Sequence, residues 1–477
     1  MIYFNWIITT LYFLTLVGTT IAVLMDNRQP AKTMAWVLVL IFLPVIGLIL
    51  FFFFGQNTHK ERIISQQSLD ELSVHSMLEF VEQKSLQLPE RYIPLIKLFI
   101  NQNFALPFKD YKAEILTSGY DYFQQLLVDI LNARRHIHLC TYIFSSDALG
   151  NLVADALVAK AREGVEVRIV YDGVGCWRTS SKFFARMEEA GIQVYAFLPV
   201  HFPAFTSKIN YRNHRKICVI DGRVGYVGGM NIADRYVKGT HRQAWRDTHL
   251  RVQGGLVYGL QRAFFVDWYF VSRELITDQK YYPSSVAEPS WSAPTAVAQV
   301  VTSSPVMEWP IIMQGYVRAM GEASRYIYIE SPYFLPNETV LFAMISAARS
   351  GVDVRLMVPL HSDAKLVEWA GSGYLSQVAE AGVKVYFYKA GFNHSKLLIV
   401  DDELCSCGST NVDFRSFENN CEANIFFYDS EMATRMKQVF LDDLAHCLPY
   451  EEVPHRFRRP FVQRLWESFT RMFAPML

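Results

Sequence analysis

The sequence predicts an α/β fold made of two repeats, each a mixed sheet flanked by helices, that share one active site and follow an amino-terminal two-helix membrane hairpin. Three observations predict it: a polar motif that occurs twice, an alternation of strand-like and helix-like segments around each copy, and two charge-free runs at the start of the chain. At 477 residues, with 51% hydrophobic and 14% aromatic content, the chain is long enough for two or three domains with large cores.

These patterns divide the chain into five segments. They are a transmembrane hairpin (1–55), a helical linker (56–107), a first repeat (108–290), a second repeat (291–450) and a basic amphipathic tail (451–477). The formal net charge is zero, which argues against a general nucleic-acid-binding protein, because such proteins carry a basic excess. The seven cysteines are scattered and show no C-x-x-C spacing, so we expect buried free thiols and a reducing compartment.

The hairpin prediction rests on residues 1–25 and 34–54, which contain no charged residue. A helix needs about 20 apolar residues to cross a bilayer, and both runs are that long. A secretory signal is the alternative for the first run, but it has no basic start or small-residue cleavage site, and a second run follows at once. Basic residues stand both in the loop (Arg28) and after the second run (Lys60), so charge does not choose the side of the membrane.

The duplicated motif begins at Asn213 and again at Asn393, and a shift of 180 residues superposes the two copies. The matching positions are Asn213, His214, Lys216, Asp221, Gly228, Asn231 and Arg235 in the first copy, and Asn393, His394, Lys396, Asp401, Gly408, Asn411 and Arg415 in the second. Strand-like and helix-like segments alternate around both copies, which indicates one structural unit used twice and a mainly parallel, helix-covered sheet.

Within each copy, two apolar runs flank a turn, and the turn of the first copy is Asp221-Gly222. This pattern predicts a β-hairpin whose turn holds Asp221, and equally Asp401, at the end away from the histidine. Two interpretations of these aspartates stay open: a catalytic partner, or a turn residue that hydrogen-bonds its own backbone.

The other end of each hairpin carries small and amide residues: Gly229 and Asn231 in the first copy, Ser409 and Asn411 in the second. Small residues let an anion approach the backbone, and the polar side chains supply hydrogen-bond donors. We therefore expect phosphate contacts there, with an ordinary loop before a helix as the alternative.

Two histidines, two lysines and two asparagines at matched positions suit transfer of a phosphodiester group. Lysines and amides stabilise the charge that grows on the phosphate oxygens, one imidazole attacks phosphorus, and the other acts as acid and then base. Each ring needs an acceptor on its other nitrogen, and the candidates are Glu422, 28 residues after His394, and Asp247, 33 residues after His214. No clustered ligand set suggests a metal, so we expect no metal and no cofactor.

The paired motifs resemble the phospholipase D superfamily from about residue 108 to residue 450. Longer segments are similar to the bacterial cardiolipin synthases of that superfamily, namely 210–216, 245–249, 331–334, 411–416 and, in the hairpin, 35–36 and 43–47. The resemblance implies that a phosphatidyl group passes from one phosphatidylglycerol in the bilayer to another through a phosphohistidine, with release of glycerol. It also implies an active-site set of His214, Lys216, Asp221, His394, Lys396 and Asp401, with His214 as the nucleophile.

The resemblance further implies a protein of the bacterial inner membrane, with two spans and the catalytic body on the cytoplasmic side. The alternative function is another phospholipase D-type lipid hydrolase or transphosphatidylase, for example one that uses phosphatidylethanolamine. A nuclease fits poorly with the spans and the neutral charge, and a membrane scaffold fits poorly with two intact His-Lys pairs. The oligomeric state is left open.

The tail alternates arginines, such as Arg464 and Arg471, with aromatic and aliphatic residues, such as Trp466 and Phe469. Two interpretations stay open for this amphipathic helix. It lies on an anionic membrane surface, or it packs on the body of the protein with a solvated basic face.

Overall fold

A computed structural model of the chain describes residues 2–25, 30–51, 88–199, 210–240, 244–283, 296–453 and 459–474. Arg28, Lys60 and most of the predicted linker lie outside these residues. The chain forms two compact units, which are residues 1–62 with 200–211, and residues 63–199 with 212–477.

The described part of the first unit contains the helices α1 (Ile2–Met25), α2 (Pro30–Phe42) and α3 (Pro44–Leu50). The break between α2 and α3 falls at Leu43, because the residue before a proline is disfavoured in helical geometry. Among the described residues, no helix combines the length and the apolarity needed to cross a membrane. The two membrane spans therefore stay a prediction.

The second unit contains two sheets of matching topology, and the first is seven-stranded with the order β2-β10-β8-β7-β3-β4-β5. Strands β3, β4 and β5 run parallel, and the other neighbours are antiparallel. Its strands are β2 (Tyr111–Leu116), β3 (His136–Thr141), β4 (Glu166–Asp172), β5 (Gln193–Phe197), β7 (Ile217–Ile220), β8 (Val224–Gly228) and β10 (His249–Gly254). Its helices are α6 (Gly119–Asn132), α7 (Ala148–Arg162), α8 (Ser181–Glu189), α9 (Arg235–Lys238) and α10 (Leu256–Ser272).

The second sheet repeats this order as β11-β20-β18-β17-β12-β14-β15, with β1 and β21 added at its edges. Its strands are β1 (Pro107–Phe108), β11 (Val297–Ser303), β12 (Tyr326–Glu330), β14 (Asp353–Pro359), β15 (Lys384–Tyr388), β17 (Leu397–Val400), β18 (Leu404–Gly408), β20 (Asn420–Tyr428) and β21 (Cys447–Pro449). Its helices are α5 (Ile93–Asn103), α11 (Ile311–Glu322), α12 (Glu338–Arg349), α13 (Lys365–Glu380), α14 (Ser430–Leu444) and α16 (Phe461–Arg471), with short turns at Glu90–Tyr92, Gln279–Tyr281, Arg415–Asn419 and Tyr450–Glu452.

The predicted α/β class, the two repeats and the mixed sheets are confirmed. The hairpins predicted around the two aspartates are the antiparallel pairs β7–β8 and β17–β18. The seven cysteines are free, and all except Cys447 are buried, as the sequence predicted.

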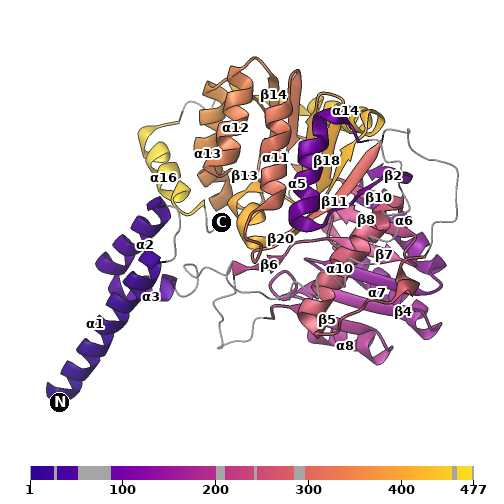
Figure 1. Cartoon of the computed structure of the whole chain (residues 1–477), viewed down its shortest axis with the longest axis horizontal. Coiled ribbons are helices and arrows are strands. Elements are labelled where there is room, and N and C mark those ends of the chain that lie inside the picture. The colour runs from indigo at the N-terminus through magenta and orange to yellow at the C-terminus, as the bar shows by residue number, and fades with distance from the viewer. Residues whose placement is uncertain are drawn as a thin grey trace. The chain divides into compact units, whose positions relative to one another are not determined.

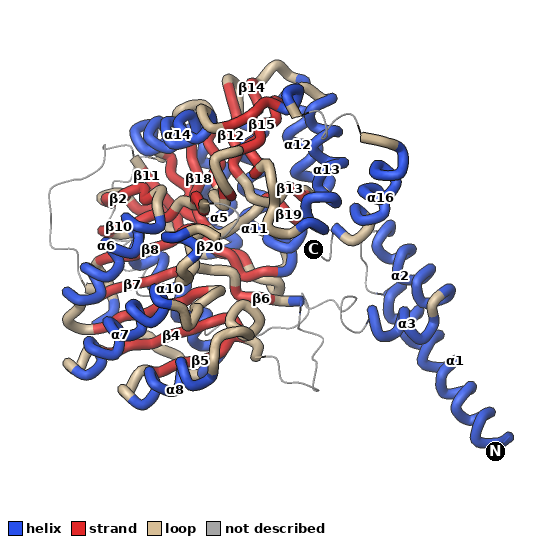
Figure 2. Tube along the Cα trace, turned by 180° about the vertical axis from the view of Figure 1, so that it is seen from behind, coloured by secondary structure: helices blue, strands red, loops and turns tan. Residues whose placement is uncertain are grey.

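Three hydrophobic clusters hold the second unit together (Figure 1, Figure 2). One lies between the first sheet and its outer helices α6, α7 and α8, and another between the second sheet and α5, α11, α12 and α13. The third joins the two sheets to each other through α10 and α14. Helix α5 thus packs on the second repeat, although it precedes the first repeat in the sequence.

Short parallel strand pairs link the repeats at the motif. Strand β6 (Arg212–Asn213) pairs with β20, and β16 (Phe392–Asn393) pairs with β9 (Trp245–Arg246). A third pair, β13 (Phe334–Leu335) with β19 (Val412–Asp413), lies within the second repeat.

Candidate active site

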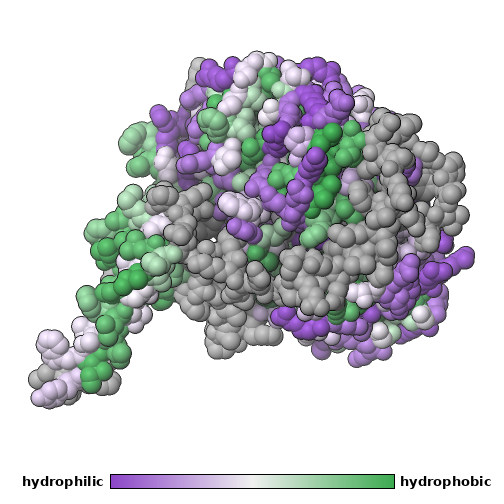
Figure 3. Space-filling view, in the orientation of Figure 1, coloured by the Kyte–Doolittle hydropathy of each residue, from purple (hydrophilic) through white to green (hydrophobic). Residues whose placement is uncertain are grey.

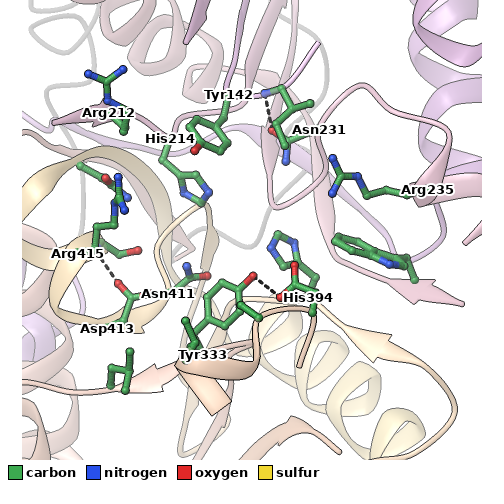
Figure 4. A pocket seen from close by; sticks show the side chains of 18 of the residues that line it. Tyr142, Arg212, His214, Asn231, Arg235, Tyr333, His394, Asn411, Asp413 and Arg415 are labelled. Carbon is green, nitrogen blue, oxygen red and sulfur yellow. Dashed lines mark hydrogen bonds between the residues drawn. The ribbon is translucent and has the colours of Figure 1, made fainter. Parts of the chain in front are cut away.

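A cavity of about 270 Å³ lies where the two repeats meet, and both motif histidines line it (Figure 4). The residues around it come from both repeats: Tyr142, Ile143, Arg212, His214, Asn231, Arg235, Tyr236, Trp245, Tyr333, Leu335, Asp363, Ala364, Val367, His394, Asn411, Asp413, Arg415, Ser416 and Asn420. The prediction that the repeats share one site is therefore confirmed.

Backbone pairing between the repeats positions both imidazoles. Strand β6 leads directly into His214, whose N–H donates to the carbonyl of Cys421 at 2.9 Å. Strand β16 leads in the same way into His394, whose N–H donates to the carbonyl of Arg246 at 2.6 Å. The backbone of each histidine is thus hydrogen-bonded to the other repeat, at the residue that directly precedes a carboxylate: Glu422 for His214 and Asp247 for His394.

Those carboxylates bind the rings crosswise. Nδ1 of His214 lies 3.0 Å from Oε1 of Glu422, and Nδ1 of His394 lies 2.6 Å from Oδ2 of Asp247. Glu422 and Asp247 were both candidates from the sequence, but their spacing did not reveal that each contacts the histidine of the opposite repeat. With the Nδ1 proton donated to a carboxylate, the Nε2 atom of a neutral ring keeps its lone pair for the substrate.

Gly229 and Ser409 explain how two different acids fit equivalent places. A Cβ atom at Gly229 would lie only 2.0 Å from Oδ1 of Asp247, so the glycine makes room for this carboxylate. Ser409 instead donates its hydroxyl to Oε2 of Glu422. Neither residue lines the cavity, and each contacts a carboxylate; the phosphate contact expected from the sequence stays a prediction.

Burial sets the protonation of the histidines. It lowers the pKa of His214 to about 4 and that of His394 to about 3, against the opposing effect of the nearby carboxylates. Burial by itself would raise the pKa of Glu422 and Asp247, but contacts with the histidines and lysines outweigh it, and both pKa values are lowered. At neutral pH the free site therefore holds two ionised carboxylates and two neutral imidazoles.

Both motif lysines are buried beside the rings. Lys216 donates from Nζ to the carbonyl of His214 at 2.6 Å, and Lys396 donates to the carbonyl of His394. Burial lowers the pKa of Lys216 to about 7 and also lowers that of Lys396. An anionic phosphate bound beside the two lysines favours their protonated forms, which then supply the positive charge that stabilises it.

The asparagines differ in what they offer the cavity. Asn231 is engaged on both sides, since its Oδ1 accepts from the N–H of Ile143 and its amide donates to the hydroxyl of Tyr236. The Oδ1 atoms of Asn411 and Asn420 are buried and have no hydrogen-bond partner among the residues that the structure describes. The amide of Asn420 donates to Glu422 at 3.1 Å, so its oxygen is the side left for a ligand.

The two motif aspartates lie in the turns of their hairpins, outside the residues that line the cavity. Asp221 accepts hydrogen bonds from the N–H groups of Arg134, Arg135 and His136, at the start of β3. It has a positive φ of 55° in the turn between β7 and β8, and it does not line the cavity.

Asp401 repeats this arrangement in the second hairpin. Its buried carboxylate accepts from the N–H groups of Ser324, Arg325 and Tyr326 and pairs with Arg91 at 2.8 Å. Burial by itself would raise the pKa of Asp401, but the backbone donors outweigh it and bring the pKa to about 2. Asp401 thus stands in a turn, but its carboxylate binds the start of β12 rather than the backbone of its own turn, and a catalytic role stays a prediction.

We expect Asp401→Asn to lower stability and leave catalysis nearly intact. Asparagine tolerates the positive φ, so the change removes mainly the charge that holds three N–H groups and Arg91. The expected cost is about 2–4 kcal/mol of unfolding free energy, with kcat unchanged within about twofold. Calorimetry and kcat of the same preparation check this, with Asp221→Asn as the companion variant. A loss of kcat at unchanged melting temperature would restore the catalytic interpretation.

Aromatic and arginine side chains that were not predicted as site residues also line the cavity. Tyr142 packs edge-on against His214 at a ring distance of 5.1 Å, and Trp245 lies 5.4 Å from the ring of His394. Arg235 and Arg415 are half-buried at matched positions of the two repeats, and both line the cavity. Their matched spacing was visible in the sequence, but no chemistry singled them out there.

Comparison with known proteins agrees with this site. A family model described as "Cardiolipin synthase, PLD-like domain" matches residues 126–246 and 316–444, and one described as "Phospholipase_D-nuclease N-terminal" matches residues 12–56. The chain is 38% identical to the major cardiolipin synthase ClsA of Bacillus subtilis, covering 99% of both chains. It is 37% identical to a cardiolipin synthase of Alkalihalophilus pseudofirmus, covering 99% of this chain and 95% of the relative.

Among solved structures, the chain is similar to a phosphatidylserine synthase of Haemophilus influenzae, with a TM-score of 0.59 and 14% identity. The match covers 80% of this chain and 100% of the other, and at this identity it shows a shared fold. The two matched domains, the full-length relatives and the shared fold lead to one assignment: the chain belongs to the cardiolipin synthase family of the phospholipase D superfamily.

Proposed function

We propose that this protein makes cardiolipin by transferring a phosphatidyl group from one phosphatidylglycerol to the primary hydroxyl of another, with release of glycerol. The observation that carries the proposal is the crossed pair of imidazole–carboxylate contacts on one cavity, His214 with Glu422 and His394 with Asp247. It supplies two rings of matched geometry for one phosphate, which a two-step displacement needs.

In the first step, Nε2 of His214 attacks phosphorus while the bond from phosphorus to the glycerol oxygen breaks. His394 gives its proton to that oxygen, and glycerol leaves. In the second step, the acceptor hydroxyl gives its proton to His394 and attacks phosphorus, and the phosphorus–nitrogen bond breaks. His394 is neutral in the free site, and the anionic phosphodiester raises its pKa when the substrate binds.

Two buried amide oxygens favour binding of an alcohol, rather than of a second anion, beside the phosphate. The free Oδ1 atoms of Asn411 and Asn420 accept hydrogen bonds, so they suit hydroxyl groups. Phosphate oxygens are acceptors themselves and do not satisfy them. A glycerol headgroup carries two free hydroxyls and fits this half of the cavity.

Lipid mass spectrometry tests the function directly. Purified protein supplied with phosphatidylglycerol alone is expected to form cardiolipin and glycerol in equal amounts. Phosphatidic acid as the only lipid product would make the protein a hydrolase. If cardiolipin forms only when phosphatidylethanolamine is added, phosphatidylethanolamine is one of the two substrates in place of a phosphatidylglycerol.

The proposal includes anchoring of the enzyme in the membrane through the two amino-terminal spans, with the catalytic body on the cytoplasmic side. We expect a form that begins near Lys60 to keep its fold, because the three hydrophobic clusters include no described residue before Leu88. It should match the full-length rate on detergent-dispersed lipid and lose about tenfold or more on vesicles, since tethering raises effective concentration. Equal loss in micelles and vesicles would make the hairpin part of the catalytic fold.

A further inference from the structure

Helix α16 exposes its apolar face and buries polar residues, the reverse of an ordinary surface helix. Its apolar side chains point away from the protein: Phe461 is 77% exposed, Val462 75% and Leu465 59%. The residues that it buries are polar, with Glu467 at 4% exposure and Thr470 at 1%. A helix that packs on a soluble protein normally buries its apolar face. Of the two interpretations left open by the sequence, this orientation suits the membrane surface and not a helix whose apolar face packs on the body of the protein.

Polar and aromatic contacts hold α16 in this orientation. Glu467 pairs with Arg459 at 2.7 Å, and the guanidinium of Arg471 lies 4.0 Å from the ring centre of Tyr374 on α13. The rings of Trp466 and Trp369, which is also on α13, meet edge to face at 6.0 Å. These contacts fix which face of the helix points outward.

The exposed face lies on a helix that packs against α13, and the first turn of α13 lines the cavity. Helix α13 begins at Lys365, directly after Ala364, and both Ala364 and Val367 line the cavity. Leu366, between them, is 42% exposed. Figure 3 shows hydrophobic side chains over α16, which Figure 1 places beside α13. An apolar surface is therefore held close to the wall of the site.

We propose that α16 is a membrane-docking helix, whose exposed face enters the boundary between lipid headgroups and acyl chains and so turns the cavity toward the bilayer. The inference rests on the proposed function, because a two-chain lipid substrate stays in the bilayer. The face combines Phe461, Phe469 and Trp466 with the exposed Arg464 at its margin. Aromatic rings with a neighbouring arginine are the composition that membrane interfaces favour.

The size of the face argues for lipid over a second copy of the chain. A stable dimer buries about 800 Å² on each partner, contributed by about 20–30 residues. The apolar face of α16 consists of seven exposed side chains on and just after one short helix: Phe461, Val462, Leu465, Trp466, Phe469, Met472 and Phe473. Lipid sets no such minimum, since each buried apolar group contributes separately.

The test uses the full-length chain with Leu465→Asn and Phe469→Asn combined. Both residues are exposed, so the double variant should fold and make cardiolipin in detergent micelles within about twofold of the unchanged protein. Its rate on phosphatidylglycerol vesicles should fall about tenfold. The matched control combines Val128→Asn and Leu131→Asn, two exposed apolar residues on α6, and should keep both rates.

A second measurement does not depend on activity. In vesicles that contain brominated lipid, the protein should show a quenched fluorescence component that Trp466→Phe removes. If no form makes cardiolipin even in micelles, the proposed function fails, while the quenching still decides the docking.

Unchanged vesicle rates together with an unquenched Trp466 overturn the docking and leave the function standing. A fall in oligomeric mass of the double variant, measured by light scattering, assigns the face to a contact between copies and also overturns the docking.

Discussion

His214→Gln is expected to remove phosphatidyl transfer, with a loss on the order of 10⁴-fold or more in kcat, because no other group on the cavity replaces the attacking nitrogen. His394→Gln should cost about 10²–10⁴-fold with phosphatidylglycerol, since it removes only the proton transfer. A phosphatidyl ester of p-nitrophenol separates the two roles. Its leaving group departs as a stable anion, so His394→Gln should still release p-nitrophenol in a burst, whereas His214→Gln should release none.

The burst should leave labelled phosphate on His214 when radiolabelled substrate is trapped and the protein is digested. His361→Gln, at an exposed histidine outside the cavity, serves as the control and should keep full activity. Label on His394, or a burst from His214→Gln, would exchange the two roles. Absence of label on both rings would argue for direct transfer without a covalent intermediate.

Glu422→Gln and Asp247→Asn should each lower kcat by about 10²–10⁴-fold with little change in KM. The amide cannot stabilise the positive charge that the ring acquires, nor can it hold the ring in a single tautomer. Because each acid belongs to the repeat opposite its histidine, Asp247→Asn should impair proton transfer by His394, and Glu422→Gln should impair attack by His214. The p-nitrophenyl ester should therefore rescue Asp247→Asn and not Glu422→Gln. Rescue of the opposite variant would contradict the crossed arrangement.

The neighbouring small residues supply a matched pair of variants. Gly229→Ala should approach the effect of Asp247→Asn, because the added methyl would lie 2.0 Å from Oδ1 of Asp247. Ser409→Gly, at the equivalent position, removes the hydrogen bond to Glu422 and the one accepted from the N–H of Ala423, without a clash, and should cost about tenfold or less. Equal effects of the two substitutions would show that the carboxylates do not depend on these positions.

The sequence predicted the repeats and the hairpins well, because both depend on local patterns. An Asp-Gly turn between apolar runs is a short-range signal, and the match between the copies extends over many residues. The crossed contacts depend on strand pairs that are two residues long, β6–β20 and β9–β16. Strands of two residues are too short to show the alternation of apolar and polar residues by which a strand is predicted. The His214–Glu422 contact also joins residues 208 positions apart.

Asp401 and α16 show two further limits. The backbone N–H partners of Asp401 lie 75 to 77 residues earlier in the chain, so a turn aspartate looks the same in the sequence whether it caps a strand or reaches a substrate. In α16 the apolar spacing predicts a helix with an apolar face, but spacing does not say whether that face points inward. Contacts with α13 decide it, such as those of Arg471 with Tyr374 and Gln377.

The exchange of carboxylates between the repeats has a consequence for the ancestry of the chain. A single repeat holds an imidazole without its acid, so an unduplicated ancestor with this arrangement functioned only as a symmetric homodimer. In such a dimer both acids are necessarily the same residue, with the same neighbour beside them. Fusion into one chain released this constraint, and the halves then diverged to Asp247 with Gly229 and Glu422 with Ser409. In one fused chain the two rings thus have different acids, and the proposed roles of attack and proton transfer can be adjusted separately.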